Sequence, residues 1–218
     1  MFTVKDIRLQ VPGRVLAEGI SFSLSPGECV LLCGANGAGK TTLLNTLVQT
    51  RENEVRMVPT VIPKVRGFSV SAFARTGCYR ESSWNGKLST AQEQQLQRAL
   101  ELLGIAALEH RDIASLSDGE FRRACLASAL VHPAQVLLLD EPTAFLDVES
   151  RSAILGTLRE VARSTGTALL FSSHDLHESL RIADRVFALT RDGRFLVSGP
   201  SDREKTIRQA FPGVSFDF

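Results

Sequence analysis

An eight-residue stretch, Gly34–Thr41, constrains the fold more than any other part of the chain; it reads Gly-Ala-Asn-Gly-Ala-Gly-Lys-Thr. It fits the pattern G-x-x-x-x-G-K-[ST] and lies between an apolar segment, Glu28–Cys33, and a segment with helical character, Thr42–Val48. Glycines in such a loop let backbone N–H groups converge on a phosphate, and the start of the following helix adds positive potential. The stretch therefore predicts a strand, a phosphate-binding loop and a helix in an α/β fold that binds a nucleotide.

Within this loop we expect Lys40 to reach the β- and γ-phosphates and the hydroxyl of Thr41 to bind Mg²⁺. A glycine-rich turn with a chance lysine is the alternative, but the order of strand, loop and helix favours the phosphate loop. The residues expected to contact the nucleotide are Gly34, Ala35, Asn36, Gly37, Ala38, Gly39, Lys40, Thr41 and Thr42.

The rest of the chain alternates short apolar segments with amphipathic helical ones, which is typical of a parallel sheet with helices packed on its faces. Segments that begin at Glu28, Gln135 and Thr167 are almost wholly apolar, so we expect them to form a core buried on both faces. The early and late strands alternate in polarity and indicate hairpins. The expected strands are Val4–Leu9, Ile20–Leu24, Glu28–Cys33, Val55–Val58, Gln135–Leu139, Thr167–Ser172, Val186–Thr190 and Arg194–Val197.

Helix starts are indicated by pairs with capping-box spacing. These pairs are Thr90 with Glu93, Ser117 with Glu120, Asp175 with Glu178, and Ser201 with Glu204. Core-facing stripes at helical spacing are Leu96, Ala99, Leu100 and Leu103, and then Ile154, Leu158 and Val161. Between them, prolines and glycines punctuate residues 60–86, where we expect a helix over Val70–Thr76 and then a loop. Residues 60–131 are thus predicted to form a small helical lobe, inserted into a nucleotide-binding lobe made of residues 1–59 and 132–218.

The composition excludes several classes of protein. Lys and Arg total 25 against 24 Asp and Glu, and this balance argues against nucleic acid as an obligate partner. Met1–Leu9 has no apolar signal core, and no run approaches the roughly 18 apolar residues that span a bilayer, so we expect a cytosolic protein. The four cysteines form no CxxC pair, which favours reduced core thiols over a metal site or disulfide.

Acidic residues end one of the core strands. Val136–Pro142 is an apolar strand followed by Asp140 and Glu141. Beside the phosphate loop, Asp140 can hold Mg²⁺ through water, and Glu141 can orient or deprotonate an attacking water. His174 follows the strand Thr167–Ser172, and there it can hydrogen-bond the γ-phosphate and Glu141; the alternative for an isolated histidine is a surface cap.

Leu116–Glu120, with the sequence Leu-Ser-Asp-Gly-Glu, has two interpretations. As structure it is a capping box that opens a helix over Phe121–Val131. As function it is a second helix N-terminus, with Ser117 and Gly119 able to bind an anion. Spacing alone leaves both open.

Five segments, taken in order, resemble the motifs of the ATP-binding subunit of an ABC transporter, and the resemblance covers essentially the whole chain. They are Gly34–Thr41, Leu116–Glu120, Val136–Pro142, Ala144–Asp147 and Ser173–Asp175. The resemblance implies a single domain over residues 1–218: an α/β P-loop NTPase cassette with a mixed, mainly parallel core sheet, antiparallel edge strands and an inserted helical lobe.

The resemblance also implies roles and partners. Ser117 and Gly119 belong to a signature that closes on the ATP of the opposite subunit in a head-to-tail pair of ATPases, Asp147 bridges the two sites, and His174 is the switch histidine. It implies ATP and Mg²⁺ as cofactors, ATP hydrolysis, integral membrane permease subunits as partners with a substrate-binding protein acting indirectly, and a place on the inner face of the cell membrane.

Three stretches, Thr143–Asp147, Ser173–Asp184 and Ala129–Pro133, are similar to ATPases of ferric-siderophore, haem and cobalamin importers. Two alternatives stay open. One is a soluble ABC-type ATPase that acts on ribosomes or DNA. The other is a nucleotide-binding module with little turnover, which Thr60, Asp118 and Glu120 suggest.

The chain departs from the family pattern in four places. Asp118 and Glu120 stand where the family has Gly and Gln, and a carboxylate at 118 would repel a γ-phosphate bound in trans, so we expect it to turn outward and hydrolysis to be slow. Thr60 replaces a glutamine that helps bind Mg²⁺ and links ATP to the helical lobe. An adenine-stacking aromatic near Val11 is missing, which predicts weak selectivity for ATP over GTP. Thr60 follows Lys40 by only 20 positions, so an antiparallel hairpin is expected to be absent.

Overall fold

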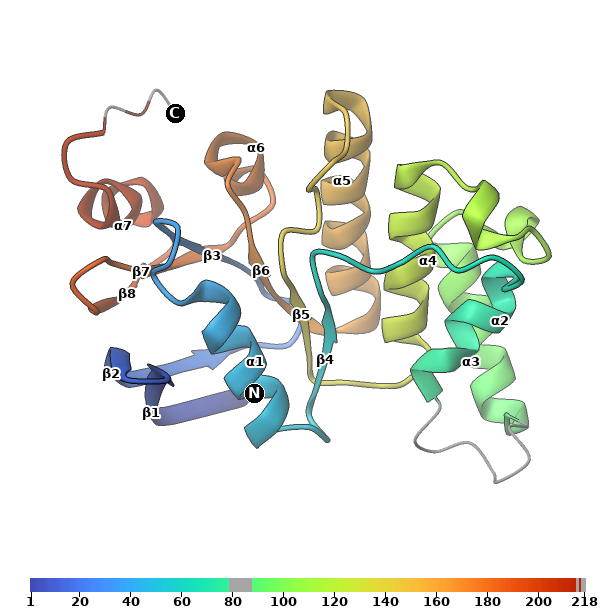
Figure 1. The fold of residues 1–218 in the computed structure, drawn as a ribbon, viewed down its shortest axis with the longest axis horizontal. Helices are drawn as coiled ribbons and strands as arrows, with labels where there is room; N and C mark the ends of the chain where they lie inside the picture. Colours follow the sequence, from blue (N-terminus) through green and yellow to red (C-terminus); the bar gives the residue numbers. More distant parts are fainter. Residues whose placement is uncertain (79–87, 215, 217–218) are drawn as a thin grey trace.

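A six-stranded sheet forms the centre of the molecule in the part that the computed structural model describes, which is residues 1–78, 88–214 and 216 (Figure 1). The strand order is β4-β5-β6-β3-β7-β8, with parallel pairing from β4 to β7 and antiparallel pairing of β8 on β7. This confirms the expected mixed sheet with a parallel core. The strands are β3 (Cys29–Gly34), β4 (Val55–Val58), β5 (Val136–Leu139), β6 (Ala168–Ser172), β7 (Arg185–Leu189) and β8 (Phe195–Val197).

A separate antiparallel hairpin, β1 (Phe2–Val11) and β2 (Arg14–Leu24), packs with helix α1 (Lys40–Thr50) on one face of the sheet. Four residues, Arg51–Glu54, then join α1 to β4 and include no strand. The predicted absence of a hairpin between Lys40 and Thr60 is therefore confirmed.

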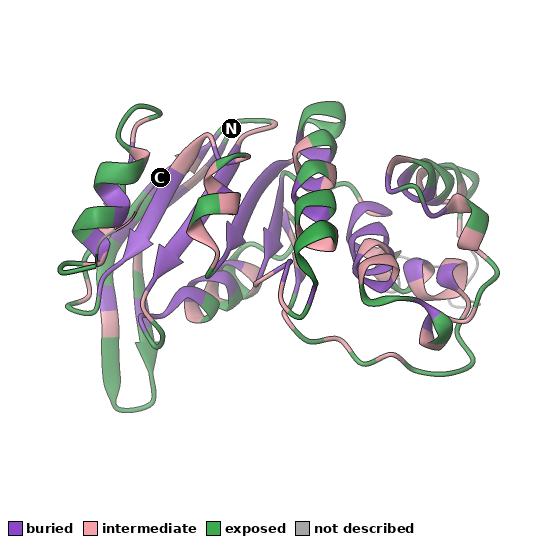
Figure 2. Cartoon of the chain, turned by 90° about the horizontal axis from the view of Figure 1, so that it is seen from above, coloured by how far each residue is buried: buried purple, intermediate pink, exposed green. Residues whose placement is uncertain are grey.

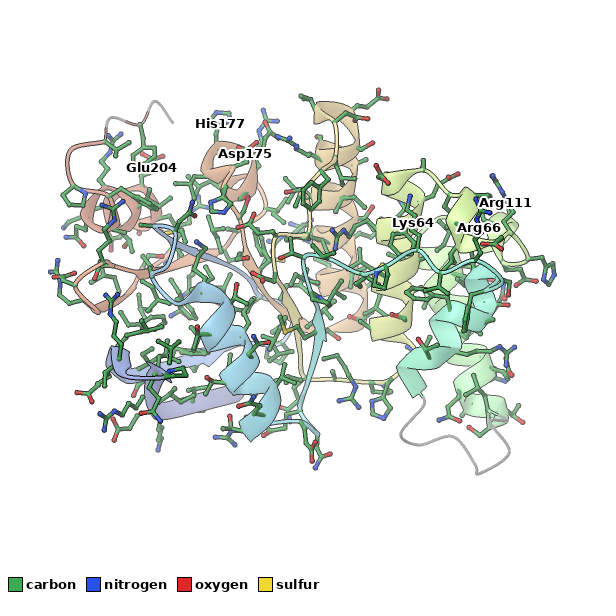
Figure 3. The ribbon with its side chains drawn as sticks, in the orientation of Figure 1. Lys64, Arg66, Arg111, Asp175, His177 and Glu204 are labelled. Atoms are coloured by element: carbon green, nitrogen blue, oxygen red, sulfur yellow. The ribbon has the colours of Figure 1, made fainter. Side chains whose placement is uncertain are left out.

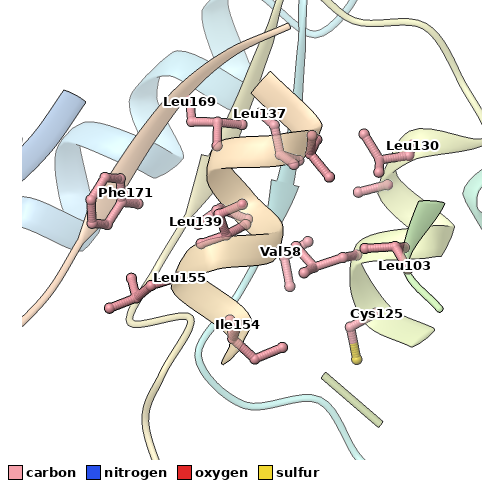
Figure 4. Packing of buried hydrophobic residues seen from close by; sticks show 14 of the residues in the cluster. Val58, Leu103, Cys125, Leu130, Leu137, Leu139, Ile154, Leu155, Leu169 and Phe171 are labelled. Atoms are coloured by element: carbon pink, nitrogen blue, oxygen red, sulfur yellow. The ribbon is translucent and has the colours of Figure 1, made fainter. Parts of the chain in front are cut away.

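Alternation along the core strands sends neighbouring side chains to opposite faces of the sheet. In β3, Leu31 belongs to the cluster under α4 and α5, whereas Leu32 belongs to the cluster under α1 and the hairpin. Both faces are covered, so the core strands are buried throughout, as expected (Figure 2). Figure 4 shows the first cluster, with Leu137, Leu139, Leu169 and Phe171 from the strands, Ile154 and Leu155 from α5, and Val58, Leu103, Cys125 and Leu130 toward α4.

The helices between β4 and β5 lie together beside the β4 edge of the sheet (Figure 1). The stripe Leu96, Ala99, Leu100 and Leu103 is buried there, as predicted. The loop expected after Val70–Thr76 falls mainly in residues 79–87, outside the described residues. The helices are α2 (Val70–Arg75), α3 (Thr90–Leu102), α4 (Asp118–Leu130), α5 (Val148–Thr165), α6 (Leu176–Leu180) and α7 (Arg203–Ala210), with 3₁₀ turns at Thr76–Cys78, Ala106–Leu108 and Ile113–Ser115.

Two of the predicted helix caps are wrong. Helix α3 is capped by Ser89, whose box partner is Gln92, so Thr90 is already the first helical residue. Ser89 is the better cap because both halves of the capping box form: its hydroxyl accepts from the Gln92 N–H, and the Gln92 side-chain oxygen accepts from the Ser89 N–H. Helix α7 has Asp202 rather than Ser201 at its start, and no side chain caps it. The other two predicted caps are confirmed, since Ser117 forms a capping box with Glu120 and Asp175 accepts from the Glu178 N–H.

The thiols that can be described are core residues. Cys29, Cys33 and Cys125 are free and buried, which confirms the prediction for these three; the Cys78 side chain lies outside the described part. Burial raises the pKa of Cys33 and of Cys125 to about 12, so both stay protonated. Within the described residues, no helix combines the length and the apolar character needed to cross a bilayer.

Candidate active site

The carboxyl ends of β3, β4, β5 and β6 meet at one edge of the sheet, because these four strands are parallel and adjacent. A cleft of about 550 Å³ opens there, a size that suits a small-molecule ligand. The structure brings most of the sequence-predicted residues together in it. The cleft is lined by Val11, Arg14, Leu16, Asn36, Gly37, Gly39, Lys40, Thr41, Thr42, Thr60, Asp140, Glu141 and His174.

Backbone geometry shapes the phosphate loop. Gly34 has φ 151°, and a Cβ there would lie 2.4 Å from the Leu189 carbonyl oxygen, so only glycine fits against β7. Gly39 has φ 106° and forms the start of α1. Lys40 is buried, and its Nζ donates to the Gly34 carbonyl oxygen at 2.8 Å, which holds the ammonium at the beginning of the loop. The loop residue Ala35 lies away from this cleft and lines a second cavity with the turn 190–194.

A buried hydrogen-bond network links the loop to the acidic pair. Thr41 Oγ1 donates to Asp140 Oδ2 at 2.9 Å, and Ser172 Oγ donates to Asp140 Oδ1 at 2.7 Å. The same Ser172 oxygen accepts from the Glu141 N–H at 2.9 Å. Sequence reasoning missed Ser172 as a site residue, although a hydroxyl that ends an apolar strand just before Ser173-His174 was an available signal.

Glu141 and His174 form the second part of the site. The backbone of Glu141 is left-handed, with φ 49°, a costly conformation for a residue other than glycine, and Glu141 lines the cleft. The His174 N–H donates to Glu141 Oε2 at 3.2 Å, and the imidazole Nε2 lies 3.3 Å from Oε1. The Glu141 side chain is only 15% exposed. Burial raises the pKa of its carboxyl, and His174 opposes that rise.

Oxygen donors suited to Mg²⁺ are present, although not as a complete protein cage. The described residues contain no group of three or more His, Cys, Asp or Glu that could hold a metal. Asp140 and the Thr41 hydroxyl are hard oxygen donors that lie in contact. Mg²⁺ is commonly held by one or two such groups together with phosphate oxygens and water, so this pair fits a magnesium-nucleotide.

The far end of the cleft belongs to the β1–β2 hairpin. Val11, Arg14 and Leu16 line it, and the described lining of the cleft includes no Phe, Tyr or Trp. This agrees with the missing aromatic near Val11. Sequence reasoning missed Arg14 and Leu16, because the turn between the two strands does not indicate which way the hairpin folds.

The signature segment lies apart from the cleft of its own chain. Ser117 caps α4, and the Asp118 side chain is 67% exposed and pairs with Lys64 at 2.7 Å. A Cβ on Gly119 would contact Ser150 of α5. Asp147 caps α5 through the Ser150 N–H. None of Ser117, Gly119 and Asp147 lines the cleft.

Comparison with known proteins shows what the chain is similar to. The ABC transporter family pattern matches residues 17–144. The phosphate import ATP-binding protein PstB 2 of Natronomonas pharaonis is 30% identical over 88% of this chain and 77% of its own length. The achromobactin transport ATP-binding protein CbrD of Dickeya dadantii is 26% identical over 92% of this chain and 82% of its own.

A solved structure agrees on the fold. An inward-facing metal-chelate type ABC transporter superposes with a TM-score of 0.84, covering 96% of this chain and 88% of that one. At 22% identity, this likeness concerns the fold alone.

Proposed function

This chain belongs to the ABC transporter family and is one of its ATP-binding, ATP-hydrolysing domains, and from that premise we propose that it energises an importer. The observation that carries the proposal is the joining of the phosphate loop, Asp140, Glu141 and His174 in one cleft. We assign ATP and Mg²⁺ to that cleft.

Phosphate binding follows from the loop. The backbone N–H groups of residues 36–41 and the N-terminus of α1 offer positive potential to the phosphates. Lys40 adds a positively charged ammonium group. When a nucleotide binds, this group would release the Gly34 carbonyl and turn to the β- and γ-phosphates. Asp140 and Thr41 would hold Mg²⁺, which supplies charge neutralisation of the triphosphate.

Hydrolysis requires a group that orients and deprotonates water. Glu141 is the carboxylate best placed for this role, because its burial raises the pKa and makes it a stronger base. The His174 backbone N–H holds one oxygen of the Glu141 carboxylate, and the imidazole Nε2 lies 3.3 Å from the other oxygen, Oε1, which has no hydrogen-bond partner of its own among the described residues. Ser172 fixes the backbone of Glu141 and the carboxylate of Asp140 together.

The proposal extends to an assembly. We assign Ser117, Gly119 and Asp147 to the ATP of a second, head-to-tail ATPase subunit, since all three lie outside the cleft of their own chain. Helices α2–α4 would form the helical lobe that contacts integral membrane permease subunits on the cytoplasmic face. The cargo we propose is an iron-siderophore, haem or cobalamin; the names of the achromobactin and phosphate relatives show that similar chains serve different substrates.

The test is Glu141→Gln, which preserves shape but removes the base. We expect the variant to bind ATP with Mg²⁺ as the wild type does, to accumulate as ATP-bound dimers in size-exclusion chromatography, and to hydrolyse ATP at least about 100-fold more slowly. Glu160→Gln, an exposed change on α5, serves as the matched control and should keep wild-type turnover. Full turnover by Glu141→Gln would remove Glu141 from the catalytic role.

A further inference from the structure

The segment that joins β4 to α2, residues 59–69, contains no helix or strand before Ser69 and crosses the N-terminal part of α4. Side chains hold the two together. Arg122 of α4 donates from Nη1 to the Pro59 carbonyl oxygen at 3.2 Å and from Nη2 to the Thr60 carbonyl oxygen at 2.9 Å. Lys64, shown beside α4 in Figure 3, donates to the Leu116 carbonyl oxygen at 3.0 Å.

Arg122 is an unusual anchor because it is a buried charge without a buried countercharge. The residue is 8% exposed, burial lowers the pKa of its guanidinium, and no carboxylate of the described residues is among the groups that act on that pKa. Its partners are the carbonyls of two consecutive residues, which the rigid guanidinium fork binds in one geometry. Separating Thr60 from α4 would leave this charge buried with fewer hydrogen bonds, so segment and helix are constrained to move together.

Thr60 also belongs to the phosphate cleft. Thr60 lines the same cleft as Thr41 and Asp140. The Asp140 N–H also donates to the carbonyl oxygen of Val58, the last residue of β4, at 3.0 Å. Asp140 is therefore hydrogen-bonded to the end of β4, and the next two residues along the backbone, Pro59 and Thr60, are hydrogen-bonded to the Arg122 side chain on α4.

We propose that Arg122 is a positioning residue: by holding the Pro59 and Thr60 carbonyls it keeps Thr60 in the lining of the phosphate cleft, in a chain where threonine stands in place of the family's glutamine. The inference rests on the proposed function for its ligand, Mg·ATP. Because coupling is reciprocal, ATP with Mg²⁺ in the cleft steadies the segment on α4, and displacement of α4 weakens binding of Mg·ATP. Arg122 touches neither substrate nor metal and acts through Thr60.

The experiment compares Arg122→Lys with Arg123→Gln in the full chain. Lysine keeps the charge but loses the two-pronged fork. Arg123 is the next residue on α4, and its guanidinium lies near Gly104, away from the segment, so Arg123→Gln tests removal of a neighbouring charge from the same helix. Where Arg122→Lys does not purify folded, Arg122→Met takes its place.

Two readouts separate positioning from general stability. In hydrogen exchange, ATP with Mg²⁺ should slow the exchange of the backbone amides of residues 60–66 in the wild type. In Arg122→Lys these amides should exchange about tenfold faster than in the wild type, and ATP with Mg²⁺ should no longer slow them appreciably. In ATP hydrolysis, Arg122→Lys should raise KM for Mg·ATP about three- to tenfold, with kcat changed less than about twofold. Arg123→Gln should change neither readout.

A Thr60→Ala background provides the decisive comparison. Because Arg122 acts through Thr60, the rise in KM caused by Arg122→Lys should shrink in that background. An undiminished rise, an equal effect of Arg123→Gln, or wild-type exchange at residues 60–66 in Arg122→Lys would each overturn the proposal. A wild-type chain that binds Mg·ATP without turnover would instead refute the proposed function, and the exchange readout would still decide the role of Arg122.

Discussion

Removal of the Ser172 hydroxyl tests the buried network most directly. Ser172 is wholly buried and makes two hydrogen bonds, one donated to the Asp140 carboxylate and one accepted from the Glu141 N–H. In Ser172→Ala the carboxylate loses a donor and the N–H loses its acceptor. A hydrogen bond to a charged group contributes about 1.5–3 kcal/mol and an unsatisfied buried donor costs about 1–3 kcal/mol. Because Asp140 keeps its hydrogen bond from Thr41, we expect a loss near the lower end of the sum, about 3 kcal/mol in the free energy of unfolding.

For a domain of this size, 1 kcal/mol shifts the melting temperature by about 2–4 °C, so Ser172→Ala should melt about 6–12 °C below the wild type. Turnover should fall about tenfold or more, because the two carboxylates lose their common support. Differential scanning calorimetry and steady-state ATP hydrolysis measure the two effects.

Ser173→Ala is the matched control, since Ser173 is also buried but hydrogen-bonds only within its own turn, to the backbone of Asp175. It should lose about 1 kcal/mol of stability and keep most of its turnover. If the two variants melt at the same temperature and hydrolyse ATP equally, the reasoning about Ser172 is wrong.

Two further variants address pH and the signature. Burial raises the pKa of Glu141 above its usual 4.5, and His174 opposes that rise, so the ionised base is lost as pH falls through the raised pKa. Removing the histidine in His174→Ala should therefore raise this pKa further and move the acid limb of the kcat–pH profile to higher pH. An unmoved limb contradicts this. Asp118→Gly should increase ATP turnover by removing a carboxylate from the start of α4, while stability falls by less than about 1 kcal/mol because the pair with Lys64 is exposed; a turnover assay without any gain contradicts it.

Local structure was largely predictable. Apolar runs indicate burial on both faces, so the strands that begin at Cys29, Val136 and Ala168 were expected to within a residue. The loop Gly34–Thr41 was readable because glycine positions and the following helix form one local unit. Cap positions were less secure: serine and threonine both accept from backbone N–H groups, and Ser89 beside Thr90 offered two starts for one helix.

The contacts between elements were not predictable in the same way. Periodicity does not reveal that β6 lies between β3 and β5, and that order is what places Ser172 beside Asp140. Likewise Arg122 is 62 residues from Thr60 in the chain, and on a helix it looks like an ordinary solvated charge. The placement of Glu141 and His174 in one cleft was expected from parallel strand ends, but neither their contacts nor the left-handed backbone of Glu141 could be read from the sequence.

The short connection Arg51–Glu54 joins two elements that both end at the cleft. The chain leaves the cleft at Lys40 along α1 and returns to it along β4, at Thr60. The middle of the connection, at Glu52 and Asn53, is exposed. Residues inserted at that point would lengthen the connection without entering the cleft, because Lys40 and Thr60, which line the cleft, lie at the opposite ends of α1 and β4. The turn is thus a suitable insertion site for a fluorescent or affinity module that reports on nucleotide binding from outside the active site.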